Sequence, residues 1–289
     1  MEIKSYKNLN GLLSLSWQLT MKCNYHCSYC SQNNNKNKYD FFSQKQIEEI
    51  AAKLKENIIF NNIPVRIHLT GGEPTLYSLS NVIKILDNDL IKNYSITTNL
   101  SRDLVYYYEL SKLLNNKKIS FSASLHETEC NIDEFIKKAN LIPNLKVYMV
   151  ATETNQNIIE KVSKKLKCEY IIRPEHDKNF NLINISSIKN NRNFNYVEIE
   201  DENGIHIFSN QSDIWKKYGA INFNGYKCKR NYYKIKPNGD VYNGSCSFIV
   251  NQKPEGNILK DNIKFNPKEI ICKSDINCNL CGKINIWRI

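Results

Sequence analysis

The sequence predicts an α/β protein in which strands and helices alternate over the first 175 residues, followed by a smaller part built from hairpins. Short apolar runs rich in Ile, Val, Tyr and Thr alternate with longer segments whose apolar residues recur at helical spacing. Such alternation requires parallel pairing through right-handed crossovers, so the strand–helix units form either a nearly closed β/α barrel or an open, doubly wound sheet. After residue 176 the alternation stops and turn-separated runs take over.

The individual elements follow from the same patterns. Strands are expected at residues 13–20, 64–70, 94–100, 119–125, 145–151 and 169–174. Helices are expected at residues 43–59, 80–89, 103–116, 132–142 and 158–167. Ser43 followed three residues later by Gln46 predicts a capping box at the start of the first helix. Hairpins are expected at residues 195–209 and 225–246, the second turning at Pro237–Gly239.

Composition limits the classes of function. The chain has 289 residues, of which 41% are hydrophobic, so a sizeable core is expected. No apolar run reaches the roughly 18 residues of a membrane span, and no export signal is visible, which predicts a cytoplasmic protein without a membrane partner. In that compartment ten cysteines indicate metal binding or chemistry rather than disulfides. The net charge of +11 comes from scattered lysines, so no nucleic-acid partner is expected.

Polar residues follow each predicted strand at the point where it ends. They are the cysteine loop of residues 23–30, the "GGEP" string of residues 71–74, Thr98, Asn99, Ser124, His126 and Arg173. In a β/α barrel the carboxyl ends of the strands form the rim that carries the chemistry. We therefore expect these side chains at one end of the sheet.

The cysteine loop has the spacing C-x3-C-x2-C, with Cys23, Cys27 and Cys30 but no fourth local cysteine. Structural zinc sites and ordinary iron–sulfur clusters use four protein ligands, whereas a catalytic metal keeps one position open. Three thiolates on a four-iron cluster would leave one iron able to chelate a small molecule.

This loop, with Tyr29 before its last cysteine and "GGEP" after the second predicted strand, resembles the radical S-adenosylmethionine (SAM) superfamily. The resemblance implies a partial (β/α)6 TIM-like barrel over residues 13–176. It also implies a four-iron cluster that cleaves SAM reductively to methionine and a 5′-deoxyadenosyl radical. That radical abstracts a hydrogen atom from the substrate, while the protein positions the reactants and excludes water.

The resemblance also implies roles for single residues. Contacts with SAM are expected from Tyr29, Gly71, Gly72, Glu73, Thr98, Asn99 and Ser124, with Glu73 accepting from the methionine ammonium. A plain strand-to-helix turn is the alternative for the glycines, and a backbone-bonded hydroxyl the alternative for Ser124. His126 and Arg173 are candidate catalytic residues that would contact substrate, move a proton or clamp an anion; a structural hydrogen bond and a structural salt bridge are their alternatives.

A second cysteine set lies in the C-terminal part. Cys228 and Cys246 bracket the second hairpin, and Cys278-x2-Cys281 follows. With "PNGDVY" and "EGNIL", this set resembles the twitch form of the SPASM auxiliary-cluster domain. The resemblance implies a second four-iron cluster within residues 177–289, with Cys272 as a possible substitute ligand. Four thiolates suit zinc as well, so zinc is the alternative metal.

The function expected from these resemblances is an anaerobic radical enzyme acting on a small polar substrate, such as a sugar, an aminocyclitol or a cell-surface precursor, by oxidation or rearrangement. No extra N-terminal leader-binding domain is expected, which disfavours the second possibility, modification of a peptide or protein. A zinc protein that binds nucleic acid is a remote alternative. The expected electron donor is a flavodoxin or ferredoxin.

Overall fold

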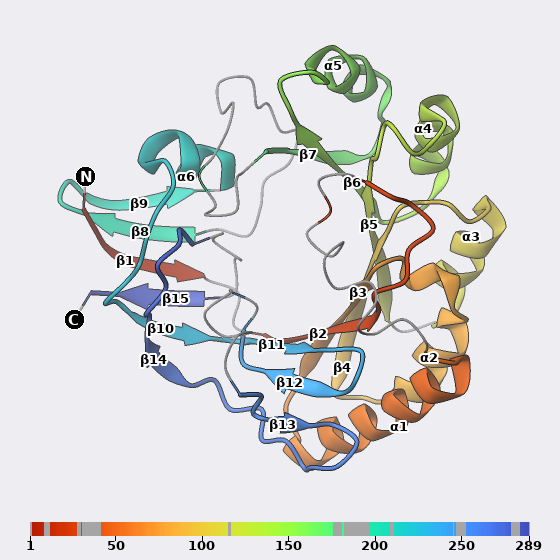
Figure 1. Ribbon diagram of the computed structural model, residues 1–289, viewed down its shortest axis with the longest axis horizontal. Helices are drawn as coiled ribbons and strands as arrows, with labels where there is room; N and C mark the ends of the chain where they lie inside the picture. The colour runs from red at the N-terminus through yellow and green to blue at the C-terminus, as the bar shows by residue number, and fades with distance from the viewer. Residues whose placement is uncertain are drawn as a thin grey trace.

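The computed structural model describes residues 2–8, 12–27, 30, 42–114, 117–175, 181, 197–208, 211–244, 246, 253–278 and 284–288. Two sheets organise these residues, one of nine strands and one of six. Figure 1 shows that the nine-stranded sheet curves through one side of the molecule, and that both chain ends lie on the six-stranded sheet at the other side.

The parallel part of the nine-stranded sheet contains the six predicted strands in chain order. They are β2 (Leu13–Thr20), β3 (Val65–Gly71), β4 (Ile91–Thr98), β5 (Lys118–Ser124), β6 (Leu145–Ala151) and β7 (Glu169–Pro174). The mixed α/β fold and the strand–helix alternation are therefore confirmed. Because the strands are parallel and sequential, their carboxyl ends all meet at one end of the sheet.

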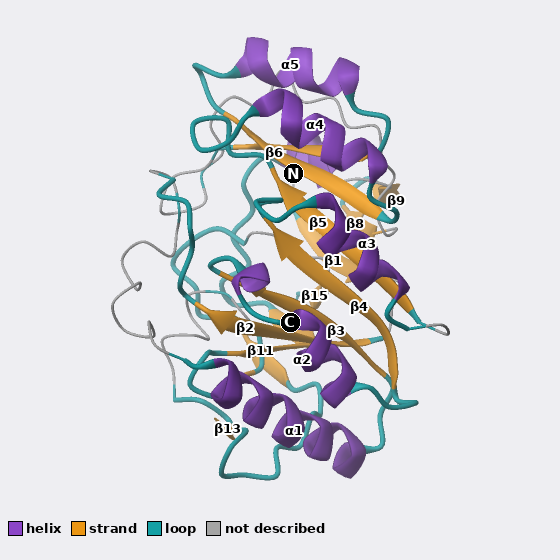
Figure 2. Cartoon of the chain, turned by 90° about the vertical axis from the view of Figure 1, so that its right-hand side faces the viewer, coloured by secondary structure: helices purple, strands orange, loops and turns teal. Residues whose placement is uncertain are grey.

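The helices lie along the outer side of this sheet (Figures 1 and 2). They are α1 (Gln44–Asn61), α2 (Leu79–Leu86), α3 (Leu104–Lys112), α4 (Ile132–Leu141) and α5 (Gln156–Lys165), with a 3-10 turn η2 (Pro74–Leu76) after β3. The predicted capping box is present, since Ser43 Oγ accepts from the Gln46 amide at 3.3 Å and Gln46 Oε1 accepts from the Ser43 amide at 2.8 Å. None of the described helices is both long and apolar enough to cross a membrane.

Strand β2 is buried along all eight residues. Leu15 and Trp17 belong to the apolar core that the sheet shares with the helices, whereas Ser16 and Gln18 are buried on the opposite face. The strand is covered on both edges because it lies between β3 and β11 (Tyr232–Ile235). Strand β2, which leads into Cys23, is thus paired with a strand on each edge and buried on both of its faces.

The six-stranded sheet is antiparallel and joins the two ends of the chain. Its order is β14 (Glu269–Ile271), β10 (Lys227–Arg230), β15 (Ile284–Trp287), β1 (Ile3–Asn8), β8 (Val197–Asp201) and β9 (Gly204–Phe208). The predicted first hairpin is confirmed as β8–β9, and helix α6 (Gln211–Tyr218) follows it. A smaller apolar cluster fills this part of the molecule.

The second predicted hairpin is only partly right. Its turn is confirmed, because β11 pairs antiparallel with β12 (Asp240–Tyr242) and the Gly239 amide donates to the Lys236 carbonyl at 3.0 Å. The first arm, however, is divided: β10 belongs to the six-stranded sheet, and the chain then crosses to the other sheet, where β11 pairs parallel with β2. The sheet ends at β13 (Gly256–Asn257).

Two asparagines of helix α1 attach the segment around residues 263–265 to that helix. Asn57 Oδ1 accepts from the Ile263 amide at 2.6 Å, while Asn61 Nδ2 donates to the Ile263 carbonyl at 2.7 Å. Asn61 Oδ1 also accepts from the Phe265 amide at 2.8 Å. These bonds satisfy backbone amides and a carbonyl of a segment that packs beside the helix and belongs to no strand.

Replacing Asn57 with alanine should lower the free energy of unfolding by about 1–3 kcal/mol, because the buried Ile263 amide then loses its acceptor. Denaturant titration of the whole chain measures the change. Glu56→Ala on the exposed face of the same helix is the matched control, with an expected change within about 0.5 kcal/mol. Equal effects of the two substitutions would contradict the anchoring role.

Candidate functional site

The cysteine loop, the glycine string and the end of β4 come together at the carboxyl end of the parallel sheet. Strand β2 pairs with β3 up to the register of Thr20 with Gly71, and β3 pairs with β4. Cys23 follows β2 by three residues, and Asn99 follows β4 directly. The three loops therefore leave adjacent strands at the same edge.

The two glycines bring the loop after β3 against the backbone that precedes Cys23. The Gly72 amide donates to the Thr20 carbonyl at 2.8 Å, and the Glu73 amide donates to the Lys22 carbonyl at 2.8 Å. A Cβ on Gly71 would lie 2.2 Å from the Thr20 carbonyl oxygen, and one on Gly72 would lie 2.1 Å from that of Lys22. Gly71 also has a φ of 137°, which side chains rarely allow. Only glycines permit this crossing of two backbones.

Glu73 ties that loop to the end of β4. Its carboxyl is 1% exposed, and Oε1 accepts from the Thr75 amide at 3.1 Å, the Thr75 hydroxyl at 2.6 Å and the Thr98 hydroxyl at 2.9 Å. Oε2 accepts from the Asn99 amide at 2.7 Å. Burial raises the pKa of Glu73, while these hydrogen bonds act in the opposite direction. The carboxyl group is thus a fixed junction between β3 and β4.

Asn99, whose backbone amide bonds to Glu73, also contacts the cysteine loop through its side chain. Its Nδ2 donates to Asn24 Oδ1 at 2.9 Å and lies 4.0 Å from Cys23 Sγ. Its Oδ1 accepts from the Ser101 amide at 3.1 Å, which fixes the orientation of the amide. A continuous set of contacts therefore runs from Glu73 through Asn99 to the first cysteine.

The three cysteines lie in one short turn. The Tyr25 amide contacts Cys23 Sγ at 3.4 Å, and the Cys30 amide donates to the Cys27 carbonyl at 3.2 Å. Burial raises the pKa of Cys27 to about 11, helped by the carboxylate of Glu129 and by the thiols of Cys30 and Cys23. A site that penalises thiolates in this way is stabilised by a bound cationic centre.

The three thiols of this loop are of the donor type that an iron–sulfur cluster takes. Among the residues with described positions, no three His, Cys, Asp or Glu side chains are arranged to hold one metal ion. In a four-iron cluster each iron takes its own thiolate, so the sulfur atoms need not converge on one point. The donor set of Cys23, Cys27 and Cys30 therefore fits an iron–sulfur cluster.

The loop after β5 covers the cysteine turn from one side. Glu129 Oε2 accepts from the His26 amide at 3.0 Å, and the His126 ring meets Tyr25 edge-on, with ring centroids 6.0 Å apart. Burial lowers the pKa of His126, against Glu127 and Glu129, which raise it, so the neutral imidazole is favoured. His126 thus lies beside the cysteine loop.

The remaining candidates are placed as follows. Ser124 is the last residue of β5, in register with Tyr148 of β6. Arg173 is exposed near the end of β7, with its guanidinium carbon 5.0 Å from the centre of the Tyr148 ring. Within the described part of the chain it stacks on that ring rather than forming an ion pair. Tyr29 lies outside the described residues.

The second cysteine set is partly visible. Cys228 is buried on β10, and Cys278 packs against the same apolar cluster. The Cys278 amide donates to the Ile221 carbonyl at 2.7 Å, and the Cys272 amide donates to the Tyr226 carbonyl at 2.8 Å. Cys246 is half-buried after β12, and Cys281 lies outside the described residues. Cys228 and Cys278, 50 residues apart in the chain, thus pack in the same apolar cluster.

Sequence reasoning missed Asn24, Thr75 and Glu129, which complete the hydrogen-bonding network. Asn24 directly follows the first cysteine of the loop, so its position was a usable signal. Thr75 lies two residues from its partner Glu73 but forms part of no pattern that the sequence analysis used. Glu129 carried no signal, because its partner, the His26 amide, is 103 residues away and is set by the packing of loops from different strands.

Comparison with known proteins identifies the class to which this fold and site belong. The family model of the radical SAM superfamily matches residues 17–165, and the chain belongs to that superfamily. It is therefore a radical SAM enzyme, and membership implies an iron–sulfur cluster and SAM as cofactors. The matched residues include the cysteine loop, the glycine string and strands β3 to β6.

Among curated proteins, the SAM-dependent nucleotide dehydratase of Fibrobacter sp. is 29% identical over 168 residues, which are 50% of this chain and 49% of that protein. An uncharacterized protein of Methanocaldococcus jannaschii is 27% identical over 194 residues, 66% of this chain and 57% of its own. The chain thus spans about half the length of the curated relatives it matches.

Among solved structures, native anSMEcpe with bound AdoMet has a TM-score of 0.56 at 18% identity, covering 88% of this chain and 80% of its own. SuiB of Streptococcus suis has a TM-score of 0.53 at 18% identity, covering 88% of this chain and 66% of its own. These similarities show the shared fold.

Proposed function

We propose that Cys23, Cys27 and Cys30 hold a four-iron cluster whose fourth iron binds SAM. When bound, this pair of cofactors supplies a carbon radical that abstracts hydrogen from the substrate. The observation that carries the proposal is the three-thiol turn, held in place by the Glu73–Asn99 network at the strand ends. The close backbone approach at Gly71 and Gly72, with two hydrogen bonds of 2.8 Å to the segment before Cys23, supports a loop that is positioned to receive the cofactors.

The contacts to SAM are proposed for the residues around this turn. Among the described residues, Glu73 Oε2 accepts one hydrogen bond, from the Asn99 amide, so a further lone pair is proposed to accept from the methionine ammonium. Thr98 and Asn99 are fixed by Glu73 and border the cysteine loop; the proposed set is completed by Tyr29, Gly71, Gly72 and Ser124. His126, neutral and beside Tyr25, and Arg173 are proposed to contact the substrate.

The C-terminal part is proposed to be a twitch-like domain over residues 177–289, next to a partial barrel over residues 13–176. Its cluster would be held by Cys228, Cys246, Cys278 and Cys281, with Cys272 as a substitute. The shared packing of Cys228 and Cys278 supports this assignment. Such a cluster would accept the electron that a substrate radical loses in an oxidation.

A small polar molecule is the proposed substrate, and a flavodoxin or ferredoxin the proposed electron donor. The face of the sheet away from the helices supports this class, because His68 there contacts the hydroxyls of Ser16 and Thr97 at 3.2 and 2.8 Å. The relative named as a nucleotide dehydratase also acts on a small polar molecule.

A peptide substrate is the second candidate. It is supported by the structures of anSMEcpe with Cp18Cys peptide and of SuiB with precursor peptide SuiA, both with TM-scores of 0.53. These enzymes share the fold with this chain over 88% and 89% of its length.

The test is an anaerobic assay of 5′-deoxyadenosine with reconstituted, dithionite-reduced protein, SAM, and separate panels of nucleotides, amino sugars and short peptides. We expect one small-molecule panel to raise the rate at least about tenfold over the uncoupled reaction. Stimulation by peptides alone would favour the second candidate. A protein that binds no iron and produces no 5′-deoxyadenosine would contradict the assignment of the cysteine turn.

A further inference from the structure

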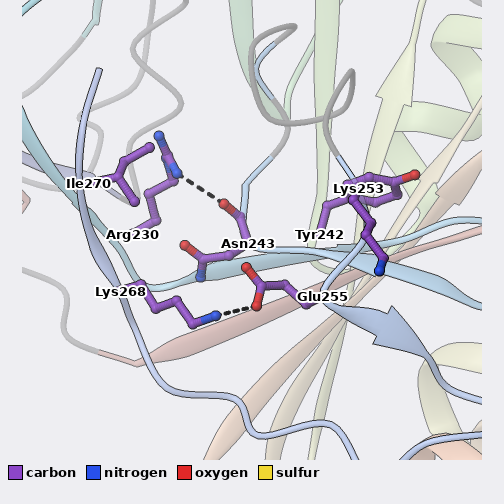
Figure 3. Close-up of a pocket in the computed structure, with 7 residues that line it drawn as sticks. All are labelled: Arg230, Tyr242, Asn243, Lys253, Glu255, Lys268 and Ile270. Atoms are coloured by element: carbon purple, nitrogen blue, oxygen red, sulfur yellow. Dashed lines mark hydrogen bonds and ion pairs between the residues drawn. The ribbon is translucent and has the colours of Figure 1, made fainter. Parts of the chain in front are cut away.

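A small cavity lies in the C-terminal part, between strands of the two sheets (Figure 3). Its volume is about 60 Å³, enough for a few water molecules or one group of the size of a phosphate. Seven side chains line it: Arg230, Tyr242, Asn243, Lys253, Glu255, Lys268 and Ile270. None of them belongs to the cysteine turn or to the network around Glu73.

Arg230 places a buried positive charge at this cavity. The residue is 4% exposed, and its Nη1 donates to the Asn243 backbone carbonyl at 3.2 Å. Among the described residues no carboxylate pairs with the guanidinium, since Glu255, the carboxylate of the cavity, is paired with Lys268. A buried cation with only a neutral partner is costly unless a counter-charge reaches it.

Asn243 adds an unsatisfied amide. It is also 4% exposed, and neither Oδ1 nor Nδ2 has a hydrogen-bonding partner within the described part of the chain. The Tyr233 hydroxyl lies beside this amide, which opposes the rise that burial causes in the pKa of Tyr233, but the hydroxyl donates its proton to the Asn266 carbonyl at 2.6 Å and does not bond the amide at hydrogen-bonding geometry. A buried amide without a hydrogen-bonding partner is destabilising, so such a group is suited to pair with a polar ligand.

The charges of the lining select the sign of that ligand. Lys268 and Glu255 neutralise each other, which leaves Arg230 and Lys253 as an excess of positive charge. Figure 3 shows the Asn243 amide between the stem of Arg230 and the Lys268–Glu255 pair. A water molecule would satisfy the amide but would leave the charge of Arg230 uncompensated.

We propose that this cavity binds a small oxyanion group, a carboxylate or a phosphate. The planar guanidinium of Arg230 suits two-pronged binding of such groups, and the Asn243 amide adds a donor. The site uses none of the residues proposed to bind SAM or a cluster, although Arg230 lies two residues from Cys228 on β10 and Asn243 three residues before Cys246. The anion is either a free ion or the charged end of a larger molecule.

The test is isothermal titration of the whole reconstituted chain, in Tris chloride, with inorganic phosphate, acetate and glycerol 3-phosphate separately. Saturable binding of at least one of the three is expected. Binding of inorganic phosphate but not of the ester would identify a free ion, whereas equal or tighter binding of the ester would identify the charged end of a larger molecule.

Arg230→Met should weaken this binding at least about tenfold, because it removes the buried charge. Lys229→Met is the matched control: it removes the same charge from the same strand, but its side chain lies on the opposite face of β10, so a change below about twofold is expected.

Asn243→Asp keeps the size of the side chain and places a carboxylate in the cavity, so it should abolish binding even where Arg230→Met does not fold. No saturable binding to the unaltered chain would show that the cavity holds water only. Unchanged binding in Asn243→Asp would equally overturn the proposal.

Discussion

Replacing Cys27 with alanine is expected to reduce 5′-deoxyadenosine formation by more than the roughly 10- to 100-fold that loss of an outer-shell partner of a metal costs. Cys27 is the buried member of the three-thiol turn, 6% exposed, and the thiols of Cys30 and Cys23 are close enough to raise its pKa. Alanine leaves only two thiolates for the cluster, which is too few to retain it. The measurement is the yield of 5′-deoxyadenosine from reduced protein and SAM, quantified per chain.

The iron content separates loss of the cluster from loss of the fold. If both proposed sites hold four irons, Cys27→Ala should lower the iron content from about eight to about four per chain. Cys168→Ala is the matched control, because Cys168 is half-buried at the margin of the main apolar core and outside the network that reaches Cys23. Cleavage of SAM at the unaltered rate in Cys27→Ala would show that this turn does not hold the active cluster.

Replacing Gly72 with alanine should lower the rate of SAM cleavage by about 100-fold or more, although Gly72 has no side chain that could take part in the reaction. The added Cβ would lie 2.1 Å from the Lys22 carbonyl oxygen and 2.7 Å from that of Met21, both of them backbone atoms. Since neither can move without displacing the chain that enters Cys23, the cysteine turn must shift. The expected signature is reduced iron incorporation together with lost activity, at a small cost in overall stability.

Gly256→Ala is the matched control for this substitution. A Cβ there would lie 2.5 Å from Ile263 Cδ1, the end of a flexible side chain that can turn away, and in a part of the chain distant in sequence from the cysteine loop. We expect this variant to lose some stability but to retain SAM cleavage. If Gly72→Ala also retained full activity, the backbone crossing would not be what positions the thiols.

Short-range features of the site and fold were accessible from the sequence. The spacing of Cys23, Cys27 and Cys30, the glycines of residues 71–74 and the capping box at Ser43 are each contained in a few consecutive residues. The strands β2 to β7 were found within three residues of their ends, because side chains that alternate between two faces leave a period in the sequence. Local backbone geometry is enough to produce all of these patterns.

The sequence by itself thus determined the class of fold, the cysteine loop and the position of polar residues at the strand ends. Only the tertiary structure decided that Glu73 bonds to Thr98 and Asn99, that Asn57 receives the Ile263 amide, and that strand β1 pairs with both β8 and β15. The two partners of each of these hydrogen bonds lie between 25 and 206 residues apart in the chain. No periodic pattern of side chains in the sequence predicts such pairs, because they form only when the packed strands bring their loops together. The same packing placed Arg230 and Asn243 around one cavity.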